Sequence, residues 1–286
     1  MPAHEPIRLL SEAQQGGSPA PVGFVRRTID LPVRTETLHV ACDVPDRPIR
    51  LADVVPLVHE IDDRLMAIYL RQVVEQGLKV FCRKGCGTCC HRYLIVYSPA
   101  EMYYQMERIE SLPEDFRRHV QGWLERTAER ARSSGLIDRL RNAGAGDKPL
   151  GLIEQWWLSQ DDGTCPFLVD EACGIHPHRF IACREHYSHS PPECCANTEI
   201  NRMATPVTLI NSLWQLEGAL TGETGGVLSL PLMKLWADVR TSEAQRTWPA
   251  VEVIDRLFGI FTETAAAAQQ LRGSVTVDRS EGEPSP

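Results

Sequence analysis

The cysteines of this chain are concentrated in its middle. Nine of the ten lie between Cys82 and Cys195, and four of these form the run CRKGCGTCC at residues 82–90. Thiols at this density either form disulfides or bind soft metal ions as thiolates, because free buried cysteines rarely cluster without a chemical reason. Cys86 and Cys89 have the C-x2-C spacing that lets two thiolates reach one ion. The run therefore predicts a metal centre, and a stripe of small apolar core residues is the alternative.

A second group of cysteines follows about 75 residues after the first. It comprises CPFL at Cys165, CGIH at Cys173, CR at Cys183 and the adjacent pair Cys194 and Cys195. The group holds no second C-x2-C, so neither a zinc ribbon with two matched knuckles nor a ferredoxin-type run fits. We expect one centre with ligands from both groups, which together offer more thiolates than a four-coordinate ion uses.

The conformation of the first group stays open at this point. If residues 82–90 were helical, all four cysteines would share one face. Gly85 and Gly87 favour instead a loop that folds around a centre.

The cations near the cysteines have two possible roles. They either offset thiolate charge and hold the thiol pKa down, or they are ordinary surface residues. These cations are Arg83, Lys84, Arg92, Arg179 and Arg184.

The combined pattern resembles the CxxCxxCC family of zinc- or iron-chelating proteins, also called the YkgJ-like family. The family usually has Tyr where this chain has His176, and Arg-Pro in place of Arg179-Phe180. The matching positions are Cys82 (with one extra residue before the next cysteine), Cys86, Cys89, Cys90, Cys165, Cys173, Cys183 and Arg184. With this resemblance, the predicted metal ligands are Cys82, Cys86, Cys89, Cys90, Cys165, Cys173 and Cys183.

Three residues near these ligands have no assigned role. His176 is either a ligand or a substitute for the aromatic residue of the family. Cys194 and Cys195 are ligands, a redox pair or spare thiols. A disulfide between them is disfavoured because adjacent cysteines close a strained eight-membered ring.

Thiolate-rich sites select zinc, Cu(I) or iron–sulfur clusters. The surplus of cysteines favours an iron–sulfur cluster over zinc, with a structural or electron-transfer role. The cysteine arrangement is also similar to that of the flagellin lysine N-methylase, a relative by cluster pattern to which an iron–sulfur centre is attributed. The alternative is therefore a metal-dependent enzyme that modifies a protein or peptide. In a third interpretation the metal is a scaffold and the C-terminal helices bind a partner.

The sequence contains few signs of conventional catalysis. It has no H-E-x-x-H, no G-x-S-x-G and no clear Gly-rich loop after a strand that would bind S-adenosylmethionine or a dinucleotide. Glu60, Asp62 and Asp63 lie on a predicted helix, where a solvated face explains them. The site therefore predicts metal binding but no specific reaction.

Composition limits the kinds of partner and the cellular compartment that we expect. A net charge of −8 and a pI near 5.6, without a basic run, argue against a nucleic-acid partner. No stretch approaches the roughly 20 apolar residues that span a bilayer, so no membrane association is expected. The first residues lack the features of a secretion signal. We therefore expect a cytoplasmic protein, in which reduced thiols favour metal binding over disulfides.

The hydrophobic pattern predicts a mainly α fold, with helices around an irregular cysteine-rich metal-binding centre and a short N-terminal β-hairpin. Alternation over 28–44 indicates two strands that bend near residues 34–35, with Cys42 in the core. Helices are expected at 51–77, 98–109, 111–133, 152–158, 207–220, 231–239 and 248–271. Ser98 with Glu101 predicts a capping box at the start of the second helix, and Ser111 ahead of Pro113 and Glu114 predicts a cap for the third. The expected parts are a mobile segment 1–22, a short β arm 23–50, a cysteine-cluster metal-binding domain 51–200, a C-terminal helical part 201–272 packed on it, and a disordered tail 273–286.

Overall fold

The computed structural model describes residues 7–11, 14, 19–83, 85–91, 93–144, 148–160, 163–195, 209–222 and 228–274. Much of the predicted mobile segment 1–22 and nearly all of the predicted tail 273–286 lie outside these residues. Two of the cations singled out above, Lys84 and Arg92, also lie outside them.

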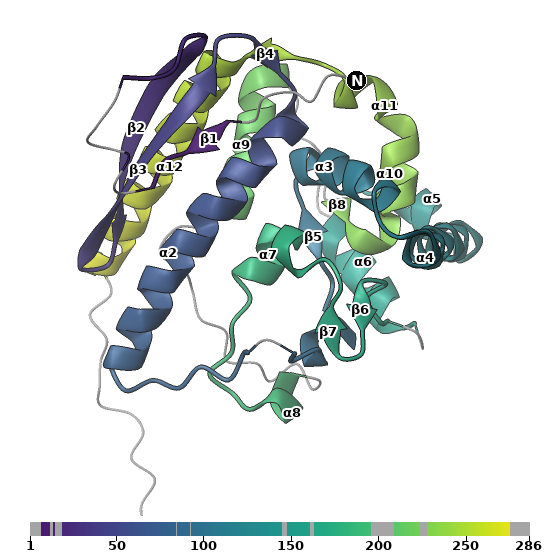
Figure 1. Cartoon of the computed structure of the whole chain (residues 1–286). Coiled ribbons are helices and arrows are strands. Elements are labelled where there is room, and N and C mark those ends of the chain that lie inside the picture. The colour runs from purple at the N-terminus through teal and green to yellow at the C-terminus, as the bar shows by residue number, and fades with distance from the viewer. Residues whose placement is uncertain are drawn as a thin grey trace, which may run out of the picture.

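The fold is mainly α, as the hydrophobic pattern predicts (Figure 1). The α-helices of the described residues are α2 (Val55–Glu75), α3 (Pro99–Glu110), α4 (Glu114–Ser133), α5 (Leu136–Arg141), α6 (Pro149–Leu158), α7 (Ile181–Arg184), α8 (Pro192–Cys195), α9 (Leu209–Thr221), α10 (Met233–Val239), α11 (Thr241–Ala244) and α12 (Ala250–Ser274). Short 3-10 helices are η1 (Leu51–Val54), η2 (Thr88–His91), η3 (His176–His178) and η4 (Leu230–Leu232).

The predicted N-terminal hairpin is present. Strands β2 (Phe24–Val33) and β3 (Glu36–Pro45) pair antiparallel, and β1 (Arg8–Leu9) pairs with the other edge of β3. The chain turns at residues 34–35, as predicted, but the strands are longer than the alternation indicates. Their extra length packs against α12, which lies along the hairpin in Figure 1 and contributes Asp255 to an ion pair with Arg27. The predicted burial of Cys42 is confirmed.

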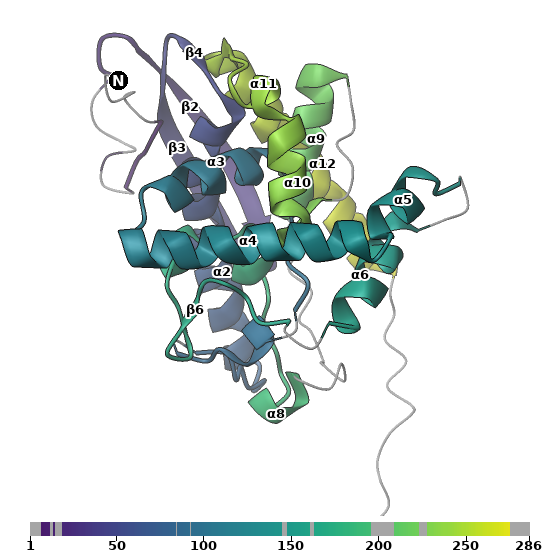
Figure 2. The same ribbon diagram turned by 90° about the vertical axis from the view of Figure 1, so that its right-hand side faces the viewer.

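Three further strand pairs join distant parts of the chain. They are β4 (Pro48–Ile49) with β9 (Trp248–Pro249), β5 (Val96–Tyr97) with β8 (Leu228–Ser229), and β6 (Leu168–Val169) with β7 (Ala172–Cys173). Figure 2 shows α4 across the molecule, with α8 on one side of it and α9 to α12 largely on the other. The segment labelled β6 lies on the same side of α4 as α8 in this view.

Local sequence signals explain several helix ends. Ser98 caps α3 in the predicted capping box, because its hydroxyl accepts from the Glu101 backbone while the Glu101 carboxylate accepts from the Ser98 backbone. Gly77 follows α2 at φ +82°, a conformation that favours glycine. The predicted cap at Ser111 is wrong. Ser111 ends α3 instead, because Pro113 takes an extended conformation and α4 begins after it.

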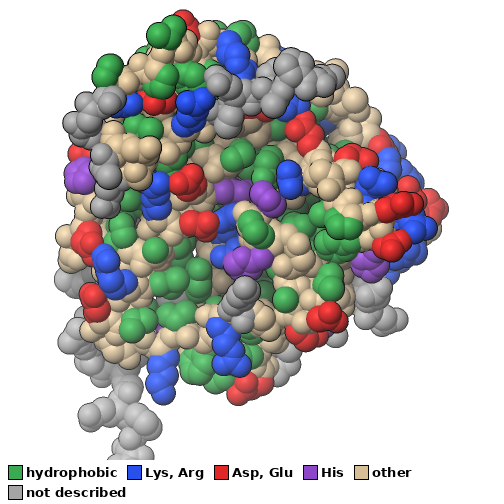
Figure 3. Space-filling model, viewed as in Figure 1, with side chains coloured by type: hydrophobic (Ala, Val, Ile, Leu, Met, Phe, Trp, Pro, Cys, Tyr) green, Lys and Arg blue, Asp and Glu red, His purple; other side chains and the backbone are tan. Residues whose placement is uncertain are grey.

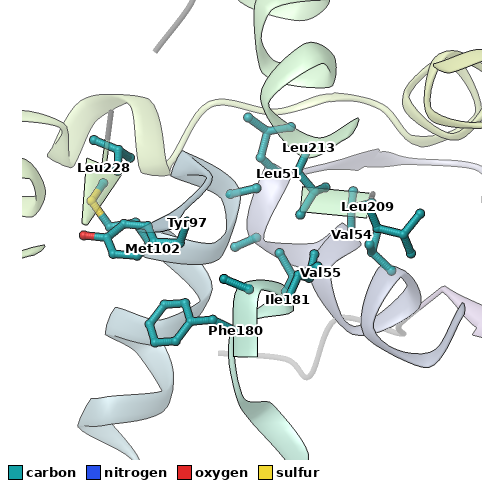
Figure 4. Packing of buried hydrophobic residues seen from close by; sticks show 14 of the residues in the cluster. Leu51, Val54, Val55, Tyr97, Met102, Phe180, Ile181, Leu209, Leu213 and Leu228 are labelled. Carbon is teal, nitrogen blue, oxygen red and sulfur yellow. The ribbon is translucent and has the colours of Figure 1, made fainter. Parts of the chain in front are cut away.

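The hydrophobic core is shared between the helical bundle and the segment before Cys183. Figure 4 shows side chains of η1, α2, α3, α7 and α9 meeting around Phe180 and Ile181. The Phe180 ring stacks on Tyr97 with ring centroids 5.2 Å apart. Both Phe180 and Ile181 are buried, so they hold the start of α7 against the core. This anchoring fixes where the backbone of Cys183 lies.

Candidate metal centre

The first cysteine group is an irregular loop rather than a helix. Residues 81–83 and 85–87 have no regular structure, and only η2, which carries Cys89 and Cys90, is helical, with 3-10 geometry. Gly85 has φ +84°, which a residue with a Cβ rarely adopts. The loop therefore turns at Gly85, and the single-face helix considered for residues 82–90 is not formed.

The two cysteine groups lie side by side. The Cys165 backbone N–H donates to the Cys90 carbonyl at 2.7 Å. Gly87 packs so closely on the second group that an added Cβ would lie 2.8 Å from Leu168 Cδ1 and 3.0 Å from the Glu171 carbonyl oxygen. These contacts join segments separated by about 75 residues of sequence.

The β6–β7 hairpin positions Cys173. Its turn residues Asp170 and Glu171 have positive φ values of 48° and 60°, and the Gly174 N–H donates to the Phe167 carbonyl at 2.8 Å. Gly174 also leaves room for the Phe116 ring, whose Cζ would lie 2.7 Å from an added Cβ. The close packing fixes the hairpin between η2 and α4.

Arg184 stabilises the segment that carries Cys183, another of the predicted ligands. Its side chain is buried, and the whole residue is 2% exposed. The guanidinium donates to the carbonyls of Pro177 and Arg179, with the latter at 3.0 Å, and pairs with Asp63 on α2. A planar fork suits these three directions, which one ammonium group cannot reproduce. Arg184 thus ties Cys183 and η3 to the long helix.

A third segment covers the start of the first cysteine group. The Ser188 N–H donates to Cys82 Sγ at 3.3 Å, and the Phe81 N–H donates to the Ser188 carbonyl at 3.1 Å. Helix α8, which carries Cys194 and Cys195, packs against η2. Ser188 also hydrogen-bonds the side chain of Cys195. Cys82 and Cys195 therefore flank the same serine.

All ten cysteines are free thiols. Burial raises the pKa of Cys165 to about 12, and it also raises the pKa of Cys173 and Cys183. A hydrogen bond with Cys90, followed by burial, raises the pKa of Cys89. Neighbouring thiols contribute in the same direction, since a second thiolate charge nearby is unfavourable. Such a group of desolvated thiols fits a soft cation, whose charge would replace the protons.

Cys89 lies near thiols of both cysteine groups. It interacts electrostatically with five of them. These are Cys82, Cys165, Cys173, Cys183 and Cys195. Among the described residues, no three Cys, His, Asp or Glu side chains converge as a ligand shell. The seven-cysteine ligand set therefore stays a prediction.

The residues with open roles are also placed. His176 is exposed on η3, with its Nε2 atom 3.0 Å from the Arg179 guanidinium. The charge of Arg179 partly offsets the rise in the pKa of Cys89, Cys173 and Cys183, as expected for a cation beside thiols. Arg83 is exposed.

A buried polar cluster next to α7 was missed by the sequence analysis. Asp62 is 1% exposed, so the expected solvated face is wrong for this residue. Burial raises its pKa to about 7. His59 and Glu101 are also buried, with His59 Nε2 3.9 Å from a Glu101 carboxylate oxygen. The i, i+3 spacing of His59 and Asp62 on α2 was the available signal. Figure 3 shows histidine, cationic and acidic side chains around a hollow of this face, over α2 and α7.

Comparison with known proteins supports metal chelation. Residues 81–206 match the model of the CxxCxxCC family, described as "Putative zinc- or iron-chelating domain". No curated protein matches the chain, and no solved structure does. No helix in the described ranges has the length and apolar character needed to cross a membrane.

Proposed function

We propose that this protein holds an iron–sulfur or zinc centre through Cys82, Cys86, Cys89, Cys90, Cys165, Cys173 and Cys183. The centre has a structural or electron-transfer role. Because free thiolates persist in a reducing compartment, we place the protein in the cytoplasm. A protein partner or substrate is compatible with this role, and we propose neither a nucleic acid nor a membrane as a partner.

One observation carries the proposal: two cysteine groups that are distant in sequence share a neighbourhood of free, desolvated thiols. The hydrogen bond from the Cys165 backbone to Cys90 and the close packing of Gly87 support it. Coordination requires the thiol side chains to rotate toward one another. The match of residues 81–206 to a zinc- or iron-chelating family supports the same chemistry.

Within this proposal we prefer an iron–sulfur cluster to zinc. A structural zinc site uses four ligands and closes, whereas the neighbourhood of Cys89 offers more thiols than that. Burial of Cys165 and partial burial of Cys183 also suit a cluster, whose potential depends on exclusion of solvent. When bound, a cluster would supply one-electron transfer, and a zinc ion would supply rigidity.

The test is purification of the full chain without oxygen, followed by elemental analysis and visible absorption. Iron, sulfide and a brown colour are expected, and a colourless protein with stoichiometric zinc would eliminate the cluster. Cys90→Ser and Cys183→Ser should each lose metal together with helical circular dichroism. Full metal content in both variants would refute the ligand assignment.

A second candidate is a metal-dependent enzyme that modifies a protein or peptide, such as a relative of lysine N-methylases. The buried carboxyl of Asp62 favours it, since its Oδ2 atom has no hydrogen-bond partner among the described residues and lies near Arg184. Incubation with S-adenosylmethionine and candidate proteins should then transfer methyl groups. Absence of both transfer and cofactor binding would count against this candidate.

A further inference from the structure

We propose that the thiols form two adjoining metal subsites rather than one, and that Cys195 is a ligand of the outer subsite. The inner subsite uses Cys165, Cys173 and Cys183. The outer subsite uses Cys82, Cys86 and Cys195 and takes one soft divalent cation of the zinc class. This inference rests on the proposed function and extends it to the number of metal sites.

Backbone contacts separate the two sets of thiols. Of the inner thiols, Cys165 and Cys173 lie on the β6–β7 side of the first cysteine group, where the Cys165 N–H donates to the Cys90 carbonyl, and Cys183 interacts with both. On the α8 side of this group, the Ser188 N–H donates to Cys82 Sγ at 3.3 Å. Helix α8 packs on η2 and brings Cys195 to the same serine. The first cysteine group therefore has a different thiol-bearing segment on each side.

The thiol neighbours follow the same division. Cys183 interacts with Cys165, Cys89 and Cys173. Cys82 interacts with Cys89, Cys195 and Cys86.

Cys89 occurs in both sets, and Cys90 is its hydrogen-bond partner on η2. One of these two thiolates completes each subsite, so that three thiolates from one side and a fourth from η2 satisfy the tetrahedral preference of zinc-class ions. Eight thiolates around a single ion would exceed that preference, so two subsites also account for the surplus of cysteines. Cys194 differs from Cys195 in that it is not among the thiols that interact with Cys82.

The test counts Cd²⁺ ions, which have high affinity for thiolates. The full chain is stripped of metal under reducing, oxygen-free conditions, titrated with Cd²⁺ and examined by native mass spectrometry. We expect two ions on the wild type and one on the Cys82→Ser/Cys195→Ser variant. The Cys194→Ser variant is the matched control and should keep two ions.

A second measurement needs no variant, in case the double substitution prevents folding. Alkylation of the wild type is followed by peptide mass spectrometry at one and two equivalents of Cd²⁺. Protection of Cys82, Cys86 and Cys195 should change at a different equivalent from protection of Cys173 and Cys183, while Cys194 stays reactive.

Two results would overturn the inference: saturation of the wild type at one ion, or protection of all these thiols in a single step. A single ion held by thiols of both segments would leave the proposed function intact. If the wild type binds no Cd²⁺ at all, both this inference and the proposed function are refuted.

Discussion

Replacing Gly87 by alanine tests whether the contact between the two cysteine groups supports metal binding. An added Cβ would lie 2.8 Å from Leu168 Cδ1, which can move, and 3.0 Å from the Glu171 carbonyl oxygen, which belongs to a hairpin turn. Overpacking of this kind costs about 1–3 kcal/mol. If the metal-bound form bears that cost, affinity falls about 5- to 150-fold, since about 1.4 kcal/mol is a factor of ten.

The assay is a competition titration of zinc against a chelating indicator, with the reduced full chain and without oxygen. Gly259→Ala is the matched control, because an added Cβ there meets nothing within 4 Å. It should leave affinity unchanged and stabilise α12 by about 0.5–1 kcal/mol. A folded Gly87→Ala variant that binds zinc as tightly as the wild type would refute the argument that this close contact assembles the centre.

Three further substitutions test how the site is supported. Arg184→Met should lower the free energy of unfolding by about 2–6 kcal/mol in urea titrations, because the carbonyls of Pro177 and Arg179 lose their donors. Phe180→Ala should cost about 3–5 kcal/mol in the same assay, because Phe180 is buried against Tyr97. Asp62→Asn should stabilise the protein at pH 8 by about 4 kcal/mol at most, since its pKa is raised from 3.8 to about 7 and each unit is about 1.4 kcal/mol.

The sign of the Asp62 effect follows from proton binding. Between about pH 4 and pH 7 the folded state keeps a proton that the unfolded state releases, so stability falls as the pH rises through this range. Asparagine cannot ionise, and the advantage of the variant should grow over the same range. A constant difference between pH 4 and pH 8 would contradict the assignment.

Arg118→Met is the control for Arg184→Met, because its pair with Asp115 is exposed, and it should cost less than about 1 kcal/mol. An Arg184→Lys variant with the unfolding free energy of the wild type would contradict the role given to the planar guanidinium. A Phe180→Ala variant as stable as the wild type would show that Phe180 does not hold the start of α7 against the core.

Local patterns in the sequence predicted much of the helical framework. The Ser98 capping box, the long amphipathic helix before Gly77 and the hairpin with its bend at residues 34–35 all follow from signals within a few residues. The cap predicted at Ser111 failed because Pro113 changed the local backbone. Short helices such as α5 have too few residues for a periodic signal.

The arrangement of the site depends on contacts between distant segments, which periodicity does not encode. The spacing of the cysteines named the candidate ligands. It did not indicate the contact between Cys82 and Ser188, because these residues lie 106 positions apart. Burial of Asp62 likewise depends on how α7 packs against α2. The closeness of Cys195 to the first group follows from the packing of α8 on η2 and had no local signal.

The most direct test of the central claim is X-ray absorption at the metal edge of the chain purified without oxygen. We expect a first shell made of sulfur alone, at about 2.3 Å. A shell dominated by nitrogen or oxygen, or a preparation without bound metal, would contradict the account.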